Sequence, residues 1–338
     1  MARNRHENYI VRTLNGLAYG YFVSVVFGII LKQIGTAVHI NMLYQWGIML
    51  GYLMGPAIGI AMGLCIDARG MNLLTALLAG TIGAGTIVVD GGQISLATGN
   101  PLLAYIAVIL AIEVGCLVQG KTPFDIWLVP VMSIGCAGLV VWLIGPFMHQ
   151  ISFWLNSVMK QCATMPSVLM GMLVALLAGV ITTSPLSSLL LTSIMVDFNG
   201  VVLGAVLAGV CSQMIGFAVM SMNDNRFGEV LAIGLGTSLL QFKNIVKRPV
   251  IWIPPLLASM LSGMISVLFS LRCSVQGSAM GLTGLLGLTD SFSIMATTYW
   301  IPLFLIDVVL PMVVCYSMYK AFRKLNYIKN GDLQISQI

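Results

Sequence analysis

The sequence has very little charge. Only 8% of its 338 residues are Asp, Glu, Lys or Arg, whereas 58% are hydrophobic. Because a soluble domain has about 25% charged residues, this composition excludes a soluble globular protein and predicts an integral membrane protein. The net charge of +5 does not form a basic face, since the cations lie in short gaps between apolar runs. We therefore expect the lipid bilayer, and no nucleic acid, as a partner.

The sequence also has few residues that could build a metal or catalytic centre. Its three histidines, at positions 6, 39 and 149, are far apart, and its seven cysteines are scattered singly. There is no CxxC or Cys/His cluster of the kind that binds zinc. The stretch GKTPFD at 120–125 lacks the GxxxxGK[ST] pattern of a phosphate-binding loop. We predict no metal, no cofactor and no catalytic residues within the chain itself.

Long apolar runs are abundant. A helix needs about 20 mostly apolar residues to cross a bilayer, and the 36 glycines suit close packing of such helices. The predicted fold is therefore an all-α integral membrane protein with about ten transmembrane helices. These candidate spans are 13–31, 42–66, 71–89, 101–119, 125–148, 166–183, 200–222, 227–243, 250–270 and 294–320.

The distribution of cations predicts the orientation. If the N-terminus is cytoplasmic, twelve of the sixteen Lys and Arg residues fall in cytoplasmic segments and four in external ones, as the positive-inside rule requires. Both termini are then cytoplasmic. The four external cations are Lys32, Lys160, Arg226 and Arg272.

Three segments do not fit simple spans. Residues 149–165 are amphipathic and predict an interfacial helix. Residues 184–198 and 277–290 are apolar but too short to cross, and Gly, Pro, Ser or Asp bound them, which predicts two re-entrant hairpins. The alternative is two apolar surface loops. The predicted organisation is an N-terminal membrane half for scaffolding and dimerisation, an interfacial linker, a C-terminal membrane half for transport, and a cytoplasmic tail (1–148, 149–165, 166–322 and 323–338).

Several motifs follow one another along nearly the whole chain. They are NGLAYGYFVSVVFGIILKQIG (15–35), EVGCLVQGKTPFDIWLVP (113–130), SQMIGFAVMSMNDN (212–225), GLGTSLLQFKNI (234–245), RPVIWIPPLLAS (248–259) and GSAMGLTGLLG (277–287). Together they resemble the membrane component, IIC, of bacterial sugar phosphotransferase systems. The similarity is to the second type of IIC family, which includes membrane regulators of perfringolysin.

This resemblance implies a homodimeric sugar permease of the bacterial cytoplasmic membrane. Such permeases bind a sugar on the outer side, carry it across, and present it to a cytoplasmic IIB domain for phosphorylation. Any phosphate-carrying Cys or His would belong to separate IIA and IIB proteins. Sugar phosphotransfer would therefore be a property of the assembled system.

Polar residues within or beside apolar segments are the candidate binding residues, because such groups are costly in a membrane. The largest group lies between 212 and 244, and amides and carboxylates there could hydrogen-bond sugar hydroxyls in pairs. Among them Thr237, Gln241 and Asn244 are spaced for one face of a helix. The alternative is that these groups join helices to one another. The candidates are Gln213, Asn223, Glu229, Thr237, Gln241 and Asn244.

Two further sets of polar residues are weighed. Thr183, Ser184 and Ser187 lie in the run ITTSPLSS, which predicts the tip of a re-entrant hairpin; the alternative is a helix end and turn at Pro185. Glu113 and Asp307 are carboxylates within predicted spans. For these two, a hydrogen bond to a neighbouring helix is favoured over proton coupling.

The leading hypothesis is a IIC-like permease for a small hydroxylated solute, a sugar, in a phosphoenolpyruvate-dependent phosphotransferase system. One alternative is a membrane sensor or regulator that keeps the IIC fold without transporting. The other is a transporter of a different solute, such as an ion, a carboxylate or a lipid-like molecule.

Overall fold

The computed structural model describes residues 9–97, 99–121, 123–186 and 188–335. Within them the chain is helical apart from loops and one antiparallel hairpin of β1 (Ile87–Asp90) and β2 (Gln93–Leu96). Six helical segments are long and apolar enough to cross a membrane, or seven if one bent pair counts as a single span. The all-α membrane class is therefore confirmed, whereas the predicted count of ten spans is not.

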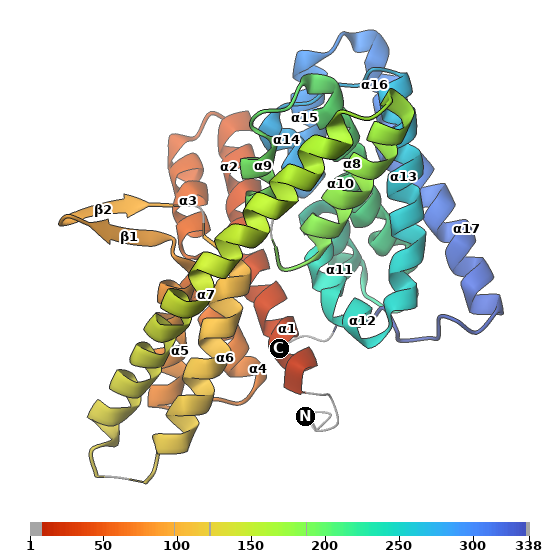
Figure 1. Cartoon of the computed structure of the whole chain (residues 1–338). Coiled ribbons are helices and arrows are strands. Elements are labelled where there is room, and N and C mark those ends of the chain that lie inside the picture. Colours follow the sequence, from red (N-terminus) through yellow and green to blue (C-terminus); the bar gives the residue numbers. More distant parts are fainter. Residues whose placement is uncertain (1–8, 98, 122, 187, 336–338) are drawn as a thin grey trace. The chain divides into compact units, whose positions relative to one another are not determined.

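The chain divides into two compact units. One comprises the chain up to Gln150, and the other comprises Ile151–Ile335. In Figure 1 the first is coloured from red to yellow and the second from yellow-green to blue. The elements of unit 1 are α1 (Tyr9–Tyr21), η1 (Phe22–Val26), α2 (Phe27–Ala37), α3 (Asn41–Tyr52), α4 (Met54–Cys65), α5 (Met71–Ala84), the β-hairpin, α6 (Pro101–Val118) and the first part of α7 (Asp125–Ala163).

Small residues allow the helices of unit 1 to approach closely. A β-carbon on Gly55 of α4 would lie 2.4 Å from the carbonyl oxygen of Gly80 in α5, and one on Gly59 would lie 2.1 Å from that of Ala76. Neither position therefore has room for a side chain. This is the packing by which membrane helices associate when no hydrophobic effect draws them together.

Unit 2 contains more interrupted helices than unit 1. After the end of α7 its elements are α8 (Ser167–Thr183), α9 (Ser188–Met195), α10 (Gly200–Met220), α11 (Phe227–Leu231), η2 (Ala232–Gly236), η3 (Ser238–Gln241), α12 (Phe242–Lys247), η4 (Pro249–Trp252), α13 (Ile253–Leu268), α14 (Val275–Met280), η5 (Thr283–Leu285), α15 (Leu286–Ile294), η6 (Thr297–Tyr299), α16 (Trp300–Phe304), η7 (Leu305–Val309) and α17 (Leu310–Lys324).

Helix α10 is the centre of unit 2. It is apolar all round and packs against α8, α13, α14 and α17 (Figure 1), as expected for a helix buried on every side. Its close approach to α8 depends on Gly209, where a β-carbon would lie 2.1 Å from the carbonyl oxygen of Ala175. The few polar side chains of α10 are therefore held in a tightly packed interior.

Four predicted boundaries differ from the structure. In the span predicted at 71–89 the helix ends at Ala84, and the last residues belong to β1. The segments 125–148 and 149–165 form one continuous helix, α7, with no break between them. The span predicted at 42–66 is bent by 61° between α3 and α4. The span predicted at 227–243 is four short pieces, α11, η2, η3 and α12, because its helical hydrogen bonding is interrupted at Thr237.

The two segments predicted as re-entrant hairpins contain short helices and turns. In the second of them α14 and α15 are separated by a turn in which Gly281, Gly284 and Leu285 have positive φ angles of 57°, 58° and 63°. Glycine adopts this backbone region without the steric cost that a side chain imposes. The helix must therefore break here, while the depth of the segment in the membrane stays a prediction.

Candidate solute-binding site

The central feature of unit 2 is a break in the chain between η2 and η3. Thr237 is extended, with φ −160° and ψ 138°, between a turn of π-helix and a turn of 3-10 helix. Its hydroxyl oxygen accepts a hydrogen bond from Leu239 N at 3.2 Å and so begins the next turn. The expectation that Thr237, Gln241 and Asn244 share one face of a regular helix is therefore wrong, because no regular helix joins them.

Gln213 is fully buried at the middle of a polar cluster. Its side-chain oxygen accepts hydrogen bonds from Thr183 Oγ1 at 3.3 Å and from Trp252 Nε1 at 3.0 Å. Its side-chain nitrogen donates to Ser259 Oγ at 3.0 Å. Thr183 is also 2.9 Å from the hydroxyl of Ser238. These five side chains, the Gln213 cluster, join α8, α10, η3, η4 and α13.

The Gln213 cluster retains hydrogen-bonding capacity for a ligand. An amide has two N–H donors and an oxygen with two lone pairs. The bonds from Thr183 and Trp252 occupy both lone pairs, and the bond to Ser259 uses one donor. Within the described part of the chain, one N–H of Gln213 is left over beside several hydroxyl groups. Such a group of donors and acceptors suits a polyhydroxylated molecule.

Two interrupted segments and the C-terminal end of α8 meet beside this cluster, which makes three interruptions of the chain. The hydroxyl of Thr283, in the turn between α14 and α15, donates to the carbonyl oxygen of Gly236 at 2.7 Å. Gly236 directly precedes the extended Thr237, and Ser238 contacts the C-terminal residue of α8, Thr183. Three chain interruptions therefore converge on one buried polar region. Irregular backbone at membrane depth is tolerated only within protein or against a water-filled path.

Gln241 and Asn244 belong to a second amide cluster. Asn244 Nδ2 donates to Gln241 Oε1 at 2.7 Å. Gln241 Nε2 donates to the main-chain oxygen of Leu333 at 2.9 Å, and Asn244 Nδ2 also lies 3.1 Å from that of Gln334. Both side chains are buried. In this structure the two amides thus bind a main-chain segment near the C-terminus of the same unit.

The other predicted site residues lie around these clusters. Ser184 is buried, and its hydroxyl donates to Ile181 O at 2.9 Å, so it ends α8. Asn223 is exposed in the turn after α10. Glu229 accepts a hydrogen bond from Arg226 N at 2.8 Å and caps α11. Ser187 lies outside the described residues.

The two carboxylates have different surroundings. Glu113 is exposed on α6. Asp307 lies in η7, is only 1% exposed, and neither of its side-chain oxygens has a hydrogen-bond partner among the described residues. A hydrogen bond to a neighbouring helix, the favoured interpretation of both residues, is not seen for Asp307 among the described residues and stays a prediction for Glu113.

Three residues of the Gln213 cluster, Ser238, Trp252 and Ser259, are not among the predicted site residues. Trp252 and Ser259 both come from the motif RPVIWIPPLLAS and are seven residues, or two helical turns, apart. That spacing places an indole N–H and a hydroxyl on one side of the same segment. The spacing of Trp252 and Ser259 is visible in the sequence. Only the structure shows that their polar groups bind the side chain of Gln213.

Comparison with known families decides the identity of the fold. The family model described as phosphotransferase system, EIIC, matches residues 11–335. The chain belongs to this family. It is therefore a membrane permease component of a phosphotransferase system that works with IIA and IIB partners, and the resemblance seen in its motifs is confirmed. No curated protein matches this EIIC chain.

Proposed function

We propose that this EIIC protein binds and translocates a sugar, and that unit 2 is the transporting part. The observation that carries the proposal is the convergence of three chain interruptions on the buried Gln213 cluster. Discontinuous helices of this kind form the substrate sites of many transporters, close to the middle of the membrane. A site that hydrogen-bonds hydroxyl groups also rejects analogues that lack them.

The proposed solute path passes both polar clusters. Gln213, Thr183 and Thr237 line its centre, and Gln241 and Asn244 line the end nearer the cationic stretch 243–248. By the positive-inside rule this end faces the cytoplasm. A sugar that moves from the first cluster to the second would therefore arrive where a IIB protein can phosphorylate it.

The remaining parts of the proposal concern the assembly. Unit 1 is the scaffold through which two copies of the chain form a homodimer in the bacterial cytoplasmic membrane. The exposed apolar side chains along α7, among them Trp127, Trp142 and Phe153, suit contact with lipid or with a second copy. Unit 2 moves relative to the membrane, with the segments 184–198 and 277–290 as re-entrant hairpins.

The test is binding and uptake with a panel of radiolabelled sugars, using the purified protein in proteoliposomes. Uptake is measured with and without a phosphorylated IIB protein enclosed in the vesicles. We expect one class of sugar to bind without IIB and to accumulate as its phosphate when IIB is present. Binding without uptake would favour a sensor, and binding of a non-hydroxylated solute instead would overturn the sugar assignment.

Substitution of the two amides gives the residue-level test. The Gln241→Ala and Asn244→Ala variants each lose hydrogen-bond donors, so sugar affinity should fall at least about tenfold, the equivalent of about 1.4 kcal/mol. Gln161→Ala on α7 is the matched control, because its side chain is exposed. Unchanged affinity in both amide variants would remove them from the site.

A further inference from the structure

The segment that follows α17 is folded onto unit 2. Ile328, Leu333 and Ile335 are 2%, 0% and 4% exposed, whereas Gln334, between the last two, is exposed. Buried and exposed side chains alternate over residues 333–335, whereas residues 330–333 form turns in which Gln334 N donates to Gly331 O at 3.2 Å. The residues 328–335, here called the tail strand, thus bury three aliphatic side chains although they form no helix or sheet.

Polar side chains of unit 2 bind the main chain of the tail strand. Asn225 uses both ends of its amide: Nδ2 donates to Leu333 O at 2.8 Å, and Oδ1 accepts from Ile335 N at 2.7 Å. Leu333 N donates to Asp224 Oδ2 at 3.3 Å. Gln241 and the rest of the second amide cluster add their bonds to main-chain oxygens of the same segment. The tail strand is therefore recognised through its backbone as well as its aliphatic side chains.

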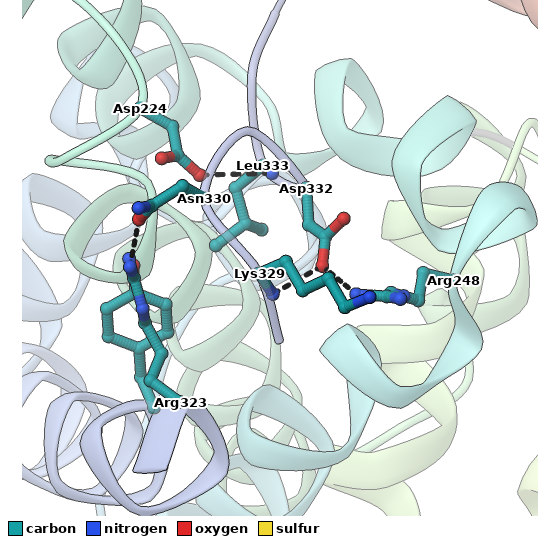
Figure 2. Close-up of polar contacts among 8 residues, drawn as sticks. Asp224, Arg248, Arg323, Lys329, Asn330, Asp332 and Leu333 are labelled. Atoms are coloured by element: carbon teal, nitrogen blue, oxygen red, sulfur yellow. Dashed lines mark hydrogen bonds and ion pairs between the residues drawn. The ribbon is translucent and has the colours of Figure 1, made fainter. Parts of the chain in front are cut away.

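Charged side chains hold the middle of the tail strand. Arg248, which follows α12, forms an ion pair with Asp332, and Arg323, near the end of α17, hydrogen-bonds to Asn330 (Figure 2). Asp332 also accepts from Lys329 N at 2.6 Å, which closes a turn within the strand. The contact therefore combines buried aliphatic groups, main-chain recognition and an ion pair.

The groups that bind the tail strand overlap the proposed solute path. Gln241 and Asn244 donate to the main-chain oxygens of residues 333 and 334. These are the same donors that a sugar hydroxyl would need. A peptide carbonyl and a sugar oxygen cannot both accept the same N–H in good geometry.

We infer that the tail strand is a plug, bound at the end of the solute path by Asn225, Gln241 and Asn244, which must leave before a sugar can use these amides. This inference rests on the proposed function for its effect on sugar binding. The binding of the tail strand itself is measured independently of any sugar. The two parts can therefore fail separately.

The first experiment measures the tail strand as a separate ligand. A variant that ends at Tyr327 is purified in detergent and titrated with a fluorescent peptide of residues 328–338. We expect saturable binding. Leu333→Ala in the peptide removes a fully buried side chain and should weaken binding at least about tenfold, whereas Gln334→Ala, which keeps the main-chain contacts, should bind like the parent peptide.

Substitutions in the protein test the side chains of unit 2 that bind the tail strand. Asn225→Ala removes two hydrogen bonds to the tail strand and should weaken peptide binding at least about tenfold. Asn223→Ala, the same substitution two residues away on an exposed side chain, should leave peptide affinity unchanged. Equal affinity of both variants for the peptide would overturn the assigned contact.

The second experiment uses the full chain and fixes the tail strand in its bound position with a disulfide bond. Asn225→Cys and Ile335→Cys are introduced after the native cysteines that are not buried, Cys116 and Cys136, have been replaced by Ser. Oxidation should abolish sugar binding, and a reductant should restore it in the same sample. The tail-less variant should bind sugar at least as tightly as the full chain.

The outcomes separate the plug from the permease. Peptide binding together with reductant-dependent sugar binding supports the inference. Sugar binding that is the same in the oxidised and reduced samples, with a disulfide shown by mass spectrometry, overturns it even though the permease stands. Peptide binding with no sugar bound by any variant overturns the proposed function and leaves the tail contact. No peptide binding by a tail-less variant that still binds sugar overturns the plug.

Discussion

Replacement of Gln213 by Met tests whether the buried cluster holds unit 2 together, binds solute, or does both. Met has nearly the volume of Gln but cannot hydrogen-bond strongly, so the substitution removes the three bonds of Gln213 without opening a large cavity. Thr183 keeps Ser238 as a partner, and Ser259 keeps the carbonyl oxygens of Gly209 and Pro255. The indole N–H of Trp252 has no other hydrogen bond among those described.

The expected loss of stability follows from these contacts. Side-chain hydrogen bonds between membrane helices contribute about 0.6 kcal/mol each on average, so three bonds amount to about 2 kcal/mol. The stranded indole N–H of Trp252 adds about 1 kcal/mol, the lower end of the cost of an unsatisfied buried donor. We therefore expect Gln213→Met to lower the free energy of unfolding by about 2–3 kcal/mol.

The assay is reversible unfolding in mixed micelles with increasing SDS, followed by tryptophan fluorescence and repeated with the exposed control Gln161→Met. A double-mutant cycle of Gln213→Met with Trp252→Phe isolates the indole bond, because Phe keeps an aromatic ring but lacks the N–H. The coupling free energy should be about 1 kcal/mol. Sugar affinity is measured on the folded fraction of each variant.

Two results would refute this reasoning. A stability loss below about 0.5 kcal/mol for Gln213→Met would mean that the three hydrogen bonds contribute nothing measurable to the fold. A full stability loss with unchanged sugar affinity would mean that the cluster only joins helices, which is the alternative already apparent from the sequence. Only a loss of both stability and affinity supports a site that is also a structural centre.

Two remaining predictions concern the surroundings of this cluster. Gly179→Ala places a methyl group 2.9 Å from Gln213 Cγ and should lower both Tm and sugar affinity, whereas Gly228→Ala, with nothing within 4 Å, should change neither; a Gly179 variant as stable as the parent would contradict the close packing. Asp307→Asn should cost less than about 0.5 kcal/mol in the same SDS assay, because neither oxygen has a described hydrogen bond to lose. A loss above about 1 kcal/mol would show that Asp307 has a partner.

Uninterrupted apolar runs are predicted well from the sequence. The spans predicted at 101–119 and 200–222 correspond to Pro101–Val118 and Gly200–Met220. Each begins after an asparagine whose side chain caps the helix. Hydropathy and the capping asparagine place the N-terminal end of each helix at the same position. Both features are local, so the sequence alone predicts this boundary.

Breaks within apolar runs are not predictable in the same way. The run 227–243 is predicted as a span because it is long and mostly apolar, but the extended backbone of Thr237 divides it. What stabilises this break is distant in sequence: Gly236 O accepts from Thr283, and Ser238 contacts Thr183. A window of twenty residues cannot contain such partners, so the break is a tertiary feature.

The candidate site is predicted in part for the same reason. Gln213 and Thr183 are identified because polar side chains in apolar segments are unusual, and the structure brings them into contact. Whether they bind solute stays a prediction. The contact of Gln241 and Asn244 with the tail strand has no sequence signal, since it joins residues about ninety positions apart through main-chain atoms that look alike in every residue.

The two polar clusters differ in the movement of the chain that is needed to free their hydrogen-bonding groups. In the Gln213 cluster every partner of Gln213 is a side chain within the packed helices, so a ligand can enter only if helices move or the remaining N–H is used. In the second cluster the amides also bind main-chain atoms of the tail strand, which belongs to no helix, so its release moves no helix. Release of the tail strand therefore costs less reorganisation than opening the Gln213 cluster. If both lie on one solute path, the end closed by the tail strand opens first.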